Sequence, residues 1–309
     1  MSSSTAFLFP GQGSQSVGML AAIIEAEPVV NATLSEANDI LGFDLRSLIL
    51  EGPPDALNAT QNTQPALLTV SVALWRLWQQ RDGQLPNYVA GHSLGEYSAL
   101  VAAGVLEFAD AVRIVRNRGI YMQEAVPQGA GAMAAVLGLE DDRVIELCRE
   151  ACQMGEVLSA VNFNSPGQVV VAGSTAAVKR SVDIFSAAGA RKVMALPVSV
   201  PSHCALMQPA AVRLEKDLAE ITFSAPLIPV VQNVSAAIVI DVNALRDNLV
   251  SQLSQPVRWV ESVQLMVANG VDSFYECGPG KVLAGLGKRI ERAVPVTSLE
   301  NFPLTDRGY

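Results

Sequence analysis

The sequence has 309 residues, which is enough for one large domain or for a large domain with a small companion. Half of the residues are hydrophobic and 17% are charged, so a substantial core can form, yet no apolar run reaches the roughly 18 residues of a membrane span. The net charge of −9 argues against general nucleic-acid binding and means that an acidic partner would need a local basic patch.

The N-terminal part begins with a short apolar segment, residues 6–9, that predicts a buried strand. The loop after it contains Gly11 and Gly13. These glycines do not form a dinucleotide-binding fingerprint, because Ser16 occupies the position of the third glycine. Such a loop can instead expose backbone N–H groups beside a site. Further along, Thr63-Gln64-Pro65 predicts the start of a helix, with the proline near its first turn.

The strongest chemical signal lies between residues 88 and 103. Residues 88–90 predict a buried strand, Gly91-His92-Ser93-Leu94-Gly95 follows, and residues 97–103 favour a helix. This order is typical of a nucleophile elbow, in which a sharp strand-to-helix turn projects a serine hydroxyl. The flanking glycines avoid clashes across that turn. We therefore predict Ser93 as a nucleophile at a helix N-terminus, where a developing negative charge is favoured.

The next predicted helix, residues 108–125, carries an apolar stripe and three arginines. Arg118 lies roughly 70° from the centre of the stripe, and Arg116 lies roughly 90° from it on the other side, at 3.6 residues per turn. Arg113 points away from the stripe. The geometry of the helix therefore favours Arg118 as a buried arginine only weakly over Arg116.

Residues 128–199 predict a compact subdomain that follows a linker-like Pro127-Gln128-Gly129. The pattern is βαββαβ, which is typical of a ferredoxin-like fold. Its strands are expected at residues 132–138, 157–162, 168–172 and 192–197, and its helices at 141–152 and 175–187. Because α/β sequence resumes afterwards, we predict an α/β fold in which residues 1–127 and 200–309 form a hydrolase-like core around the serine elbow, with the ferredoxin-like subdomain inserted.

The C-terminal part alternates helices and strands again. Helices are expected at residues 205–220, 244–253, 257–269 and 281–292, and strands at 227–231 and 273–277. The last helix follows a turn at Gly278-Pro279-Gly280.

A serine nucleophile needs a base, and the chain has two histidines. His92 is adjacent to Ser93 and should point elsewhere at an elbow, which leaves His203 in the loop Pro201-Ser202-His203. No carboxylate stands out as a third member. An α/β-hydrolase would also place its histidine near the C-terminus, whereas over a hundred residues follow His203. We therefore predict a Ser–His dyad in which a backbone carbonyl holds His203.

The cysteines and histidines predict no metal site and no disulfide framework. The four cysteines contain no C-x-x-C pair, so we expect buried, reduced thiols in a cytoplasmic protein. No lysine or arginine precedes Arg46, so the start of the sequence lacks the basic segment of a secretory signal.

Five motifs occur in one order along nearly the whole chain. They are Phe9-Pro10-Gly11-Gln12-Gly13-Ser14-Gln15, Gln64-Pro65-Ala66-Leu67, Gly91-His92-Ser93-Leu94-Gly95-Glu96-Tyr97, Pro201-Ser202-His203 and Gly278-Pro279-Gly280-Lys281. Together they resemble the bacterial malonyl-CoA:acyl carrier protein transacylases of type II fatty acid synthesis.

The resemblance implies an acyltransferase that moves malonyl from malonyl-CoA to the phosphopantetheine thiol of acyl carrier protein, without a bound cofactor. It implies Ser93 as nucleophile, His203 as base and Arg118 as the partner of the malonyl carboxylate. It also implies that the main-chain N–H groups of Gln12 and Leu94 form an oxyanion hole, and that the main chain of Gln252 orients the histidine. Neither nucleic acid nor a membrane is an expected partner.

Other readings of the motifs stay open at this point. The same chemistry would serve a malonyl-transfer subunit of malonate decarboxylase or a discrete acyltransferase of polyketide synthesis. A serine thioesterase is a more distant alternative, and a non-catalytic module that docks a carrier protein is another. Carrier proteins are acidic, so docking is expected to use some basic residues among Lys179, Arg180, Arg191, Lys192, Lys281, Lys288 and Arg289.

Overall fold

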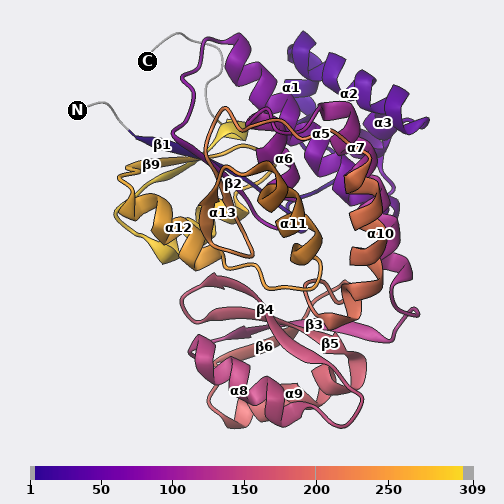
Figure 1. Cartoon of the computed structure of the whole chain (residues 1–309), viewed down its shortest axis with the longest axis vertical. Helices are drawn as coiled ribbons and strands as arrows, with labels where there is room; N and C mark the ends of the chain where they lie inside the picture. The colour runs from indigo at the N-terminus through magenta and orange to yellow at the C-terminus, as the bar shows by residue number, and fades with distance from the viewer. Residues whose placement is uncertain (1–3, 199, 302–309) are drawn as a thin grey trace.

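The computed structural model describes residues 4–198 and 200–301, and two sheets organise them (Figure 1). The larger sheet has the strand order β10-β9-β1-β2-β7-β8. Its strands are β1 (Thr5–Phe9), β2 (Tyr88–Gly91), β7 (Val230–Gln232), β8 (Ala237–Val239), β9 (Ser273–Glu276) and β10 (Val296–Ser298). All neighbours are parallel except β7 and β8.

Helices cover both faces of this sheet, because successive side chains of a strand point to opposite sides. In β1, Phe7 and Phe9 belong to a core cluster shared with α5 (Thr60–Gln80) and α7 (Phe108–Glu124). Ala6 and Leu8 belong to a second cluster, shared with α12 (Trp259–Ala268) and α13 (Val282–Ile290). The other helices of this part are α1 (Ala21–Ala26), α2 (Pro28–Leu41), α3 (Leu45–Glu51), α4 (Pro54–Asn58), α6 (Gly95–Ala102), η1 (Ala205–Met207), α10 (Gln208–Ala219), α11 (Val242–Gln252) and η2 (Leu299–Asn301).

The start of α5 differs from the sequence prediction. The helix begins at Thr60, so Pro65 lies inside it rather than near its first turn. A proline has no N–H to donate to the carbonyl four residues earlier, which is that of Gln61. Arg116 Nη1 lies 3.4 Å from the Gln61 oxygen and donates to it instead. A partner from another helix therefore compensates for the missing bond.

The smaller sheet has the order β4-β5-β3-β6, with all pairs antiparallel. Its elements are β3 (Gly131–Leu137), α8 (Asp141–Ala151), β4 (Leu158–Ser165), β5 (Gln168–Ser174), α9 (Thr175–Ala187) and β6 (Lys192–Ala195). Figure 1 shows both helices on the face away from the larger sheet. This is the strand order of a ferredoxin-like fold, so the predicted fold class is confirmed. The predicted domain boundaries remain predictions, and residue 199 and both chain ends lie outside the described residues.

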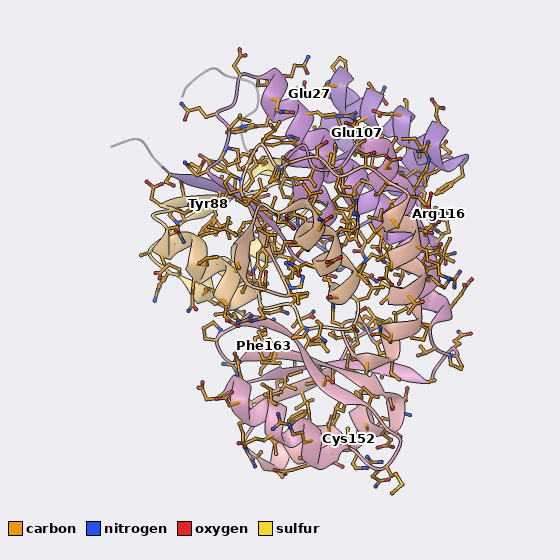
Figure 2. All side chains as sticks on the ribbon, viewed as in Figure 1. Glu27, Tyr88, Glu107, Arg116, Cys152 and Phe163 are labelled. Atoms are coloured by element: carbon orange, nitrogen blue, oxygen red, sulfur yellow. The ribbon has the colours of Figure 1, made fainter. Side chains whose placement is uncertain are left out.

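The smaller sheet is tied through β4 to the segment just before α12. The Val257 N–H donates to the Val161 oxygen at 2.8 Å, and the Phe163 N–H donates to the Val257 oxygen at 3.0 Å. Figure 2 shows Phe163 at this junction. Within residues 4–198 and 200–301, no helix combines the length and the apolar character that crossing a membrane requires.

Candidate active site

The nucleophile elbow has the predicted geometry. Ser93 lies between β2 and α6 with a φ of 51°, in the left-handed region that non-glycine residues rarely adopt. A Cβ added at Gly91 would lie 1.9 Å from the carbonyl carbon of Gly95, and one added at Gly95 would lie 2.0 Å from the Phe9 oxygen. Both positions therefore require glycine, and the turn packs directly against the end of β1.

The structure brings His203 to the serine across 110 residues of sequence. His203 Nε2 lies 2.8 Å from Ser93 Oγ, and Nδ1 lies 2.6 Å from the main-chain oxygen of Gln252. A carbonyl oxygen can only accept, so Nδ1 carries the proton and Nε2 is free to accept the serine proton. No carboxylate among the described residues bonds to either ring nitrogen. His92 points elsewhere, with Nε2 at 2.7 Å from Asn164 Oδ1.

The environment of His203 keeps its imidazole neutral. Burial is the main cause and the positive charge of Arg118 the next, and together they lower the pKa of His203 to about 3. The unfolded chain binds a proton on this histidine below about pH 6.5, whereas the native chain does not until about pH 3. This histidine therefore makes the native state less stable as the pH falls below about 6.5.

We expect the His203 imidazole signal in a proton NMR titration to stay unchanged from about pH 8 to about pH 5, because the neutral form persists. The chain has only two histidines, so a His203→Ala variant assigns the signal by its absence. A midpoint near 6.5 for that signal would contradict the described environment.

Arg118 reaches the same site from α7 and is 1% exposed. Its Nη1 donates to Gln64 Oε1 at 2.8 Å, and its Nη2 donates to Gln252 Oε1 at 3.0 Å and to Ser93 Oγ at 3.4 Å. None of these acceptors is a carboxylate, and Nε has no partner among the described residues. Arg116 instead bonds at the start of α5. The structure thus places Arg118, and not Arg116, beside the serine with donors to spare.

A cavity of about 110 Å³ joins these groups. It is lined by polar residues of the site and by apolar side chains that include Met122, Met133 and Val200. Gln12 and Leu94 also line it, and within the described chain neither of their N–H groups donates a hydrogen bond to another residue. Two free N–H donors beside a serine hydroxyl can hold an oxyanion. Their predicted role remains a prediction.

The sequence did not reveal the side-chain contacts that three polar residues make in the site; for Gln252, only a main-chain role was predicted. Gln64 was noted only within a motif, yet its side chain holds Arg118. The side chain of Gln252 bonds both Arg118 and the Ser93 oxygen. Asn233 accepts the Ser93 N–H at 2.7 Å. The available signal was a glutamine directly before the apolar run of residues 65–68, because a fully buried polar side chain needs a partner.

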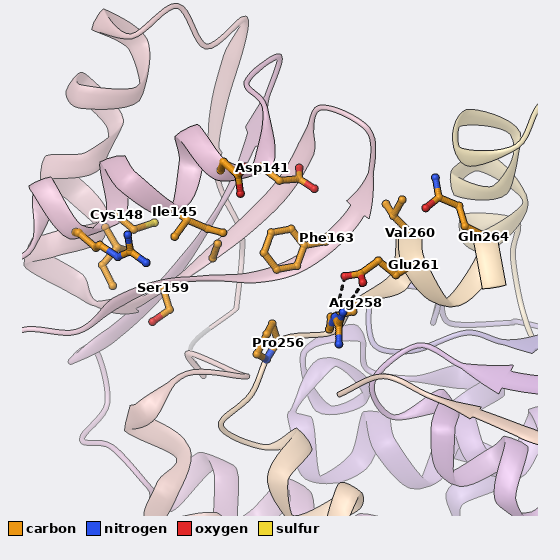
Figure 3. Close-up of a pocket in the computed structure, with 14 residues that line it drawn as sticks. Asp141, Ile145, Cys148, Ser159, Phe163, Pro256, Arg258, Val260, Glu261 and Gln264 are labelled. Atoms are coloured by element: carbon orange, nitrogen blue, oxygen red, sulfur yellow. Dashed lines mark hydrogen bonds and ion pairs between the residues drawn. The ribbon is translucent and has the colours of Figure 1, made fainter. Parts of the chain in front are cut away.

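A second, larger cavity of about 710 Å³ lies between α8, β4 and α12 (Figure 3). Phe163 points into it, and Arg258 pairs with Glu261 at its rim. Its one thiol belongs to Cys148, whose pKa is raised to about 12 by burial, so a thiolate is scarce there. None of the predicted catalytic residues lines this cavity. The smaller cavity is therefore the candidate active site.

Comparisons with known proteins identify the family of the chain. The sequence model of the family described as "Acyl transferase domain" matches residues 6–305. The chain is 57% identical over 294 residues to the malonyl CoA-acyl carrier protein transacylase of Escherichia coli (strain K12), with 95% of each covered.

Solved structures of malonyl transacylases are also similar to this chain. The malonyl CoA-acyl carrier protein transacylase of Coxiella burnetii superposes with a TM-score of 0.96 at 46% identity, and the match covers 98% of this chain and 95% of that one. A malonyl-transacylase solved in complex with its type II polyketide acyl-carrier protein also gives 0.96, at 51% identity and with 98% and 97% covered.

Proposed function

The chain belongs to the acyl transferase domain family, and from this premise we propose that it transfers malonyl from malonyl-CoA to the phosphopantetheine thiol of acyl carrier protein through a malonyl ester of Ser93. One observation carries the proposal for the residues. A serine hydroxyl lies 2.8 Å from a neutral imidazole and 3.4 Å from a buried arginine that forms no hydrogen bond to a carboxylate of the described residues. A nucleophile, a base and a carboxylate receptor thus share one small cavity.

The first half-reaction uses these groups as follows. Ser93 Oγ attacks the thioester carbonyl carbon while its proton moves to His203 Nε2. The Gln12 and Leu94 N–H groups hold the resulting oxyanion, and such a donor typically contributes ~3 kcal/mol. The carbon–sulfur bond then breaks, and His203 returns the proton to the leaving CoA thiolate. In the second half-reaction the thiol of the carrier takes the place of CoA, and the same steps run in reverse.

No carboxylate of residues 4–198 and 200–301 bonds to His203, and this favours a thiol over water as the second acceptor. A thiol is several pKa units more acidic than water, so an unassisted imidazole can activate it. Arg118 would also hold the acyl group in one pose through its carboxylate, which suits a single line of attack. These two features support a transferase rather than a thioesterase.

The test is mass spectrometry of the intact protein, first after malonyl-CoA and then after holo carrier protein. We expect a stable malonyl adduct that buffer discharges slowly and that the carrier thiol discharges rapidly. His203→Ala should slow both acylation and discharge. Spontaneous loss of the adduct, with free malonate appearing as fast as CoA, would instead indicate a thioesterase.

A polyketide carrier protein is the second candidate acceptor, because one structural neighbour was solved with such a carrier. Fatty acid synthesis remains our first assignment, since curated relatives that are 57% identical to this chain are named malonyl CoA-acyl carrier protein transacylases. Discharge rates measured with both kinds of holo carrier would separate the two. We also propose a cytoplasmic location, based on four free cysteines, which are typical of a reducing compartment.

Docking of the acidic carrier should depend on exposed basic residues. Among the predicted set, Arg180 is engaged by Glu156 at 2.7 Å, whereas Arg191 and Lys288 are exposed without an ion-pair partner in the described chain. We expect discharge by holo carrier to slow as salt rises, because surface charges are screened over ~8–10 Å at physiological ionic strength.

Free pantetheine is the control acceptor, since it lacks the charges of the carrier. Reversing Arg191 and Lys288 to glutamate should slow discharge by carrier and leave discharge by pantetheine unchanged. Reversing Arg143, which is exposed on α8 and pairs with Glu146, is the matched control. Salt-independent discharge, unaffected by the charge reversals, would show that docking is not electrostatic.

A further inference from the structure

Asn233 directly follows β7, at the position where the hydrogen-bond ladder between β2 and β7 would make its next bond. The two strands are parallel, with Val89 beside Val230 and Ala90 beside Val231, and the Val89 N–H donates to the Pro229 oxygen at 3.0 Å. In a parallel ladder, bonds alternate between the strands at regular steps. The next donor to the Gly91 oxygen would therefore be the backbone N–H of Asn233.

The backbone does not make that bond, and the Asn233 side chain makes it instead. The Asn233 N–H turns away and donates to Glu96 Oε2 at 2.7 Å. Asn233 Nδ2 donates to the Gly91 oxygen at 2.6 Å, and Oδ1 accepts the Ser93 N–H at 2.7 Å. One carboxamide thus takes the place of a backbone peptide group and extends the ladder as far as the nucleophile.

The chemistry of the neighbours fixes the orientation of this carboxamide. The Gly91 oxygen can only accept and the Ser93 N–H can only donate, so the amide nitrogen must face Gly91 and the amide oxygen must face Ser93. Asn233 is fully buried, so its side chain is out of contact with bulk solvent. Both contacts therefore restrain the two residues on either side of His92.

The restraint acts on the strained part of the elbow. Ser93 holds a φ of 51°, and such a conformation persists only where the surrounding structure over-determines it. By accepting the Ser93 N–H, Asn233 also removes that donor from the cavity. Leu94 is then the elbow residue whose N–H remains free for an oxyanion.

Glu96 in turn fixes Asn233. This carboxylate is fully buried on α6, and besides the Asn233 N–H it accepts from Gln232 Nε2 at 3.1 Å. The positive charge of Arg118 also acts on Glu96, and the side chain of Gln252 is a further hydrogen-bonding neighbour of this carboxylate. These two hydrogen bonds come from Gln232, at the end of β7, and from Asn233, the residue after it, so Glu96 ties the first turn of α6 to the residue that holds the serine.

We propose that Asn233 is a positioning residue for acyl transfer, whose carboxamide holds Ser93 in the conformation that aims Oγ at His203, and that Glu96 fixes the place of Asn233. The inference rests on the proposed function, because it assigns Asn233 to the acyl-transfer step. It does not place Asn233 in contact with the substrate.

The test compares Asn233→Ala with Asn248→Ala. Asn248 donates to Gln232 Oε1 at 2.8 Å, so it belongs to the same network but does not touch the elbow. In single-turnover acylation by malonyl-CoA we expect Asn233→Ala to slow the rate at saturation by about 100-fold, the order of loss that a misplaced reacting group causes. The KM for malonyl-CoA should stay within about threefold, because Arg118 keeps its contacts. Asn248→Ala should keep both values.

A small aryl sulfonyl fluoride gives a second readout that does not need the malonyl group. Ser93 Oγ displaces fluoride as its proton passes to His203, and labelling should slow in Asn233→Ala to a similar extent. If that variant does not fold, Asn233→Asp serves, because it keeps the shape and the acceptor for Ser93 but loses the donor to Gly91. We expect its labelling to slow by at least about 10-fold.

Three results would overturn the proposal. They are an unchanged labelling rate in a folded Asn233 variant, a loss carried entirely by KM, and an equal loss in Asn248→Ala. A wild-type protein that is labelled by the sulfonyl fluoride but takes no malonyl group would contradict the proposed function, while the role of Asn233 would still be decided by the labelling rates.

Discussion

Replacing Ser93 by alanine is expected to abolish the malonyl adduct and to reduce malonyl transfer by at least ~10⁴-fold, the scale on which loss of a serine nucleophile is felt. The hydroxyl of Ser93 is the group that His203 Nε2 contacts, at 2.8 Å. Arg118 and the N–H groups that we propose as oxyanion donors would remain in the variant. They can bind the substrate, but they offer no atom that forms the ester.

Mass spectrometry of the intact protein after malonyl-CoA measures this effect, and peptide mapping locates the acyl group. Ser98→Ala is the matched control, since Ser98 is a buried serine of α6, the helix that follows Ser93, and its Oγ has no partner in the described chain. It should acylate like the wild type. An adduct that persists in Ser93→Ala, or one that maps to another residue, would refute the assignment of Ser93 as the nucleophile.

Much of this arrangement was predictable because its signals are local. The elbow needs a strand, two glycines and a helix within about fifteen residues. Glycine is required at both positions because a Cβ added at Gly91 or Gly95 would lie 1.9 or 2.0 Å from a backbone atom. The ferredoxin-like part was predictable because strand and helix patterns alternate over a short stretch. The motifs also indicated the family, and the comparisons confirm it.

Features that depend on distant residues were not predictable. Nothing in the sequence near Ser93 indicates Asn233, which lies 140 residues away and meets it only because β2 and β7 are neighbours. The strands β8 and β10 have three residues each, too few for a periodic pattern. Helical periodicity favoured Arg118 only weakly over Arg116. Their different roles follow from packing, which carries Arg118 to Gln64 and Arg116 to the start of α5.

Replacing Arg118 by alanine is expected to separate malonyl from acetyl transfer. In the proposed complex the malonyl carboxylate is buried against the guanidinium, and removing one partner of such a pair typically costs about 2–5 kcal/mol, or roughly 30-fold to several thousand-fold in rate. An acetyl group carries no charge at that position. Its transfer should fall by less than about 10-fold, so the ratio of the two kcat/KM values measures the contribution of Arg118.

Two further variants show whether the fork of the guanidinium matters. Arg118→Lys keeps a positive charge but cannot bind both carboxylate oxygens while also bonding Gln64 and Gln252, so it should recover only part of malonyl transfer. Arg116→Ala removes the neighbouring arginine, which bonds Gln61 and Asn62 outside the cavity, and should leave the malonyl-to-acetyl ratio unchanged.

The acetyl rate also shows whether Arg118→Ala merely disrupts the nucleophile and the base. Arg118 contacts Ser93 Oγ and Gln252, so its loss could disturb the nucleophile and the base as well as the carboxylate receptor. Damage of that kind slows both acyl groups by the same factor, because the ester forms through the same atoms in both. Equal losses would therefore refute the carboxylate role even if malonyl transfer disappeared, whereas a selective loss requires that Arg118 acts on the charge that only malonyl carries.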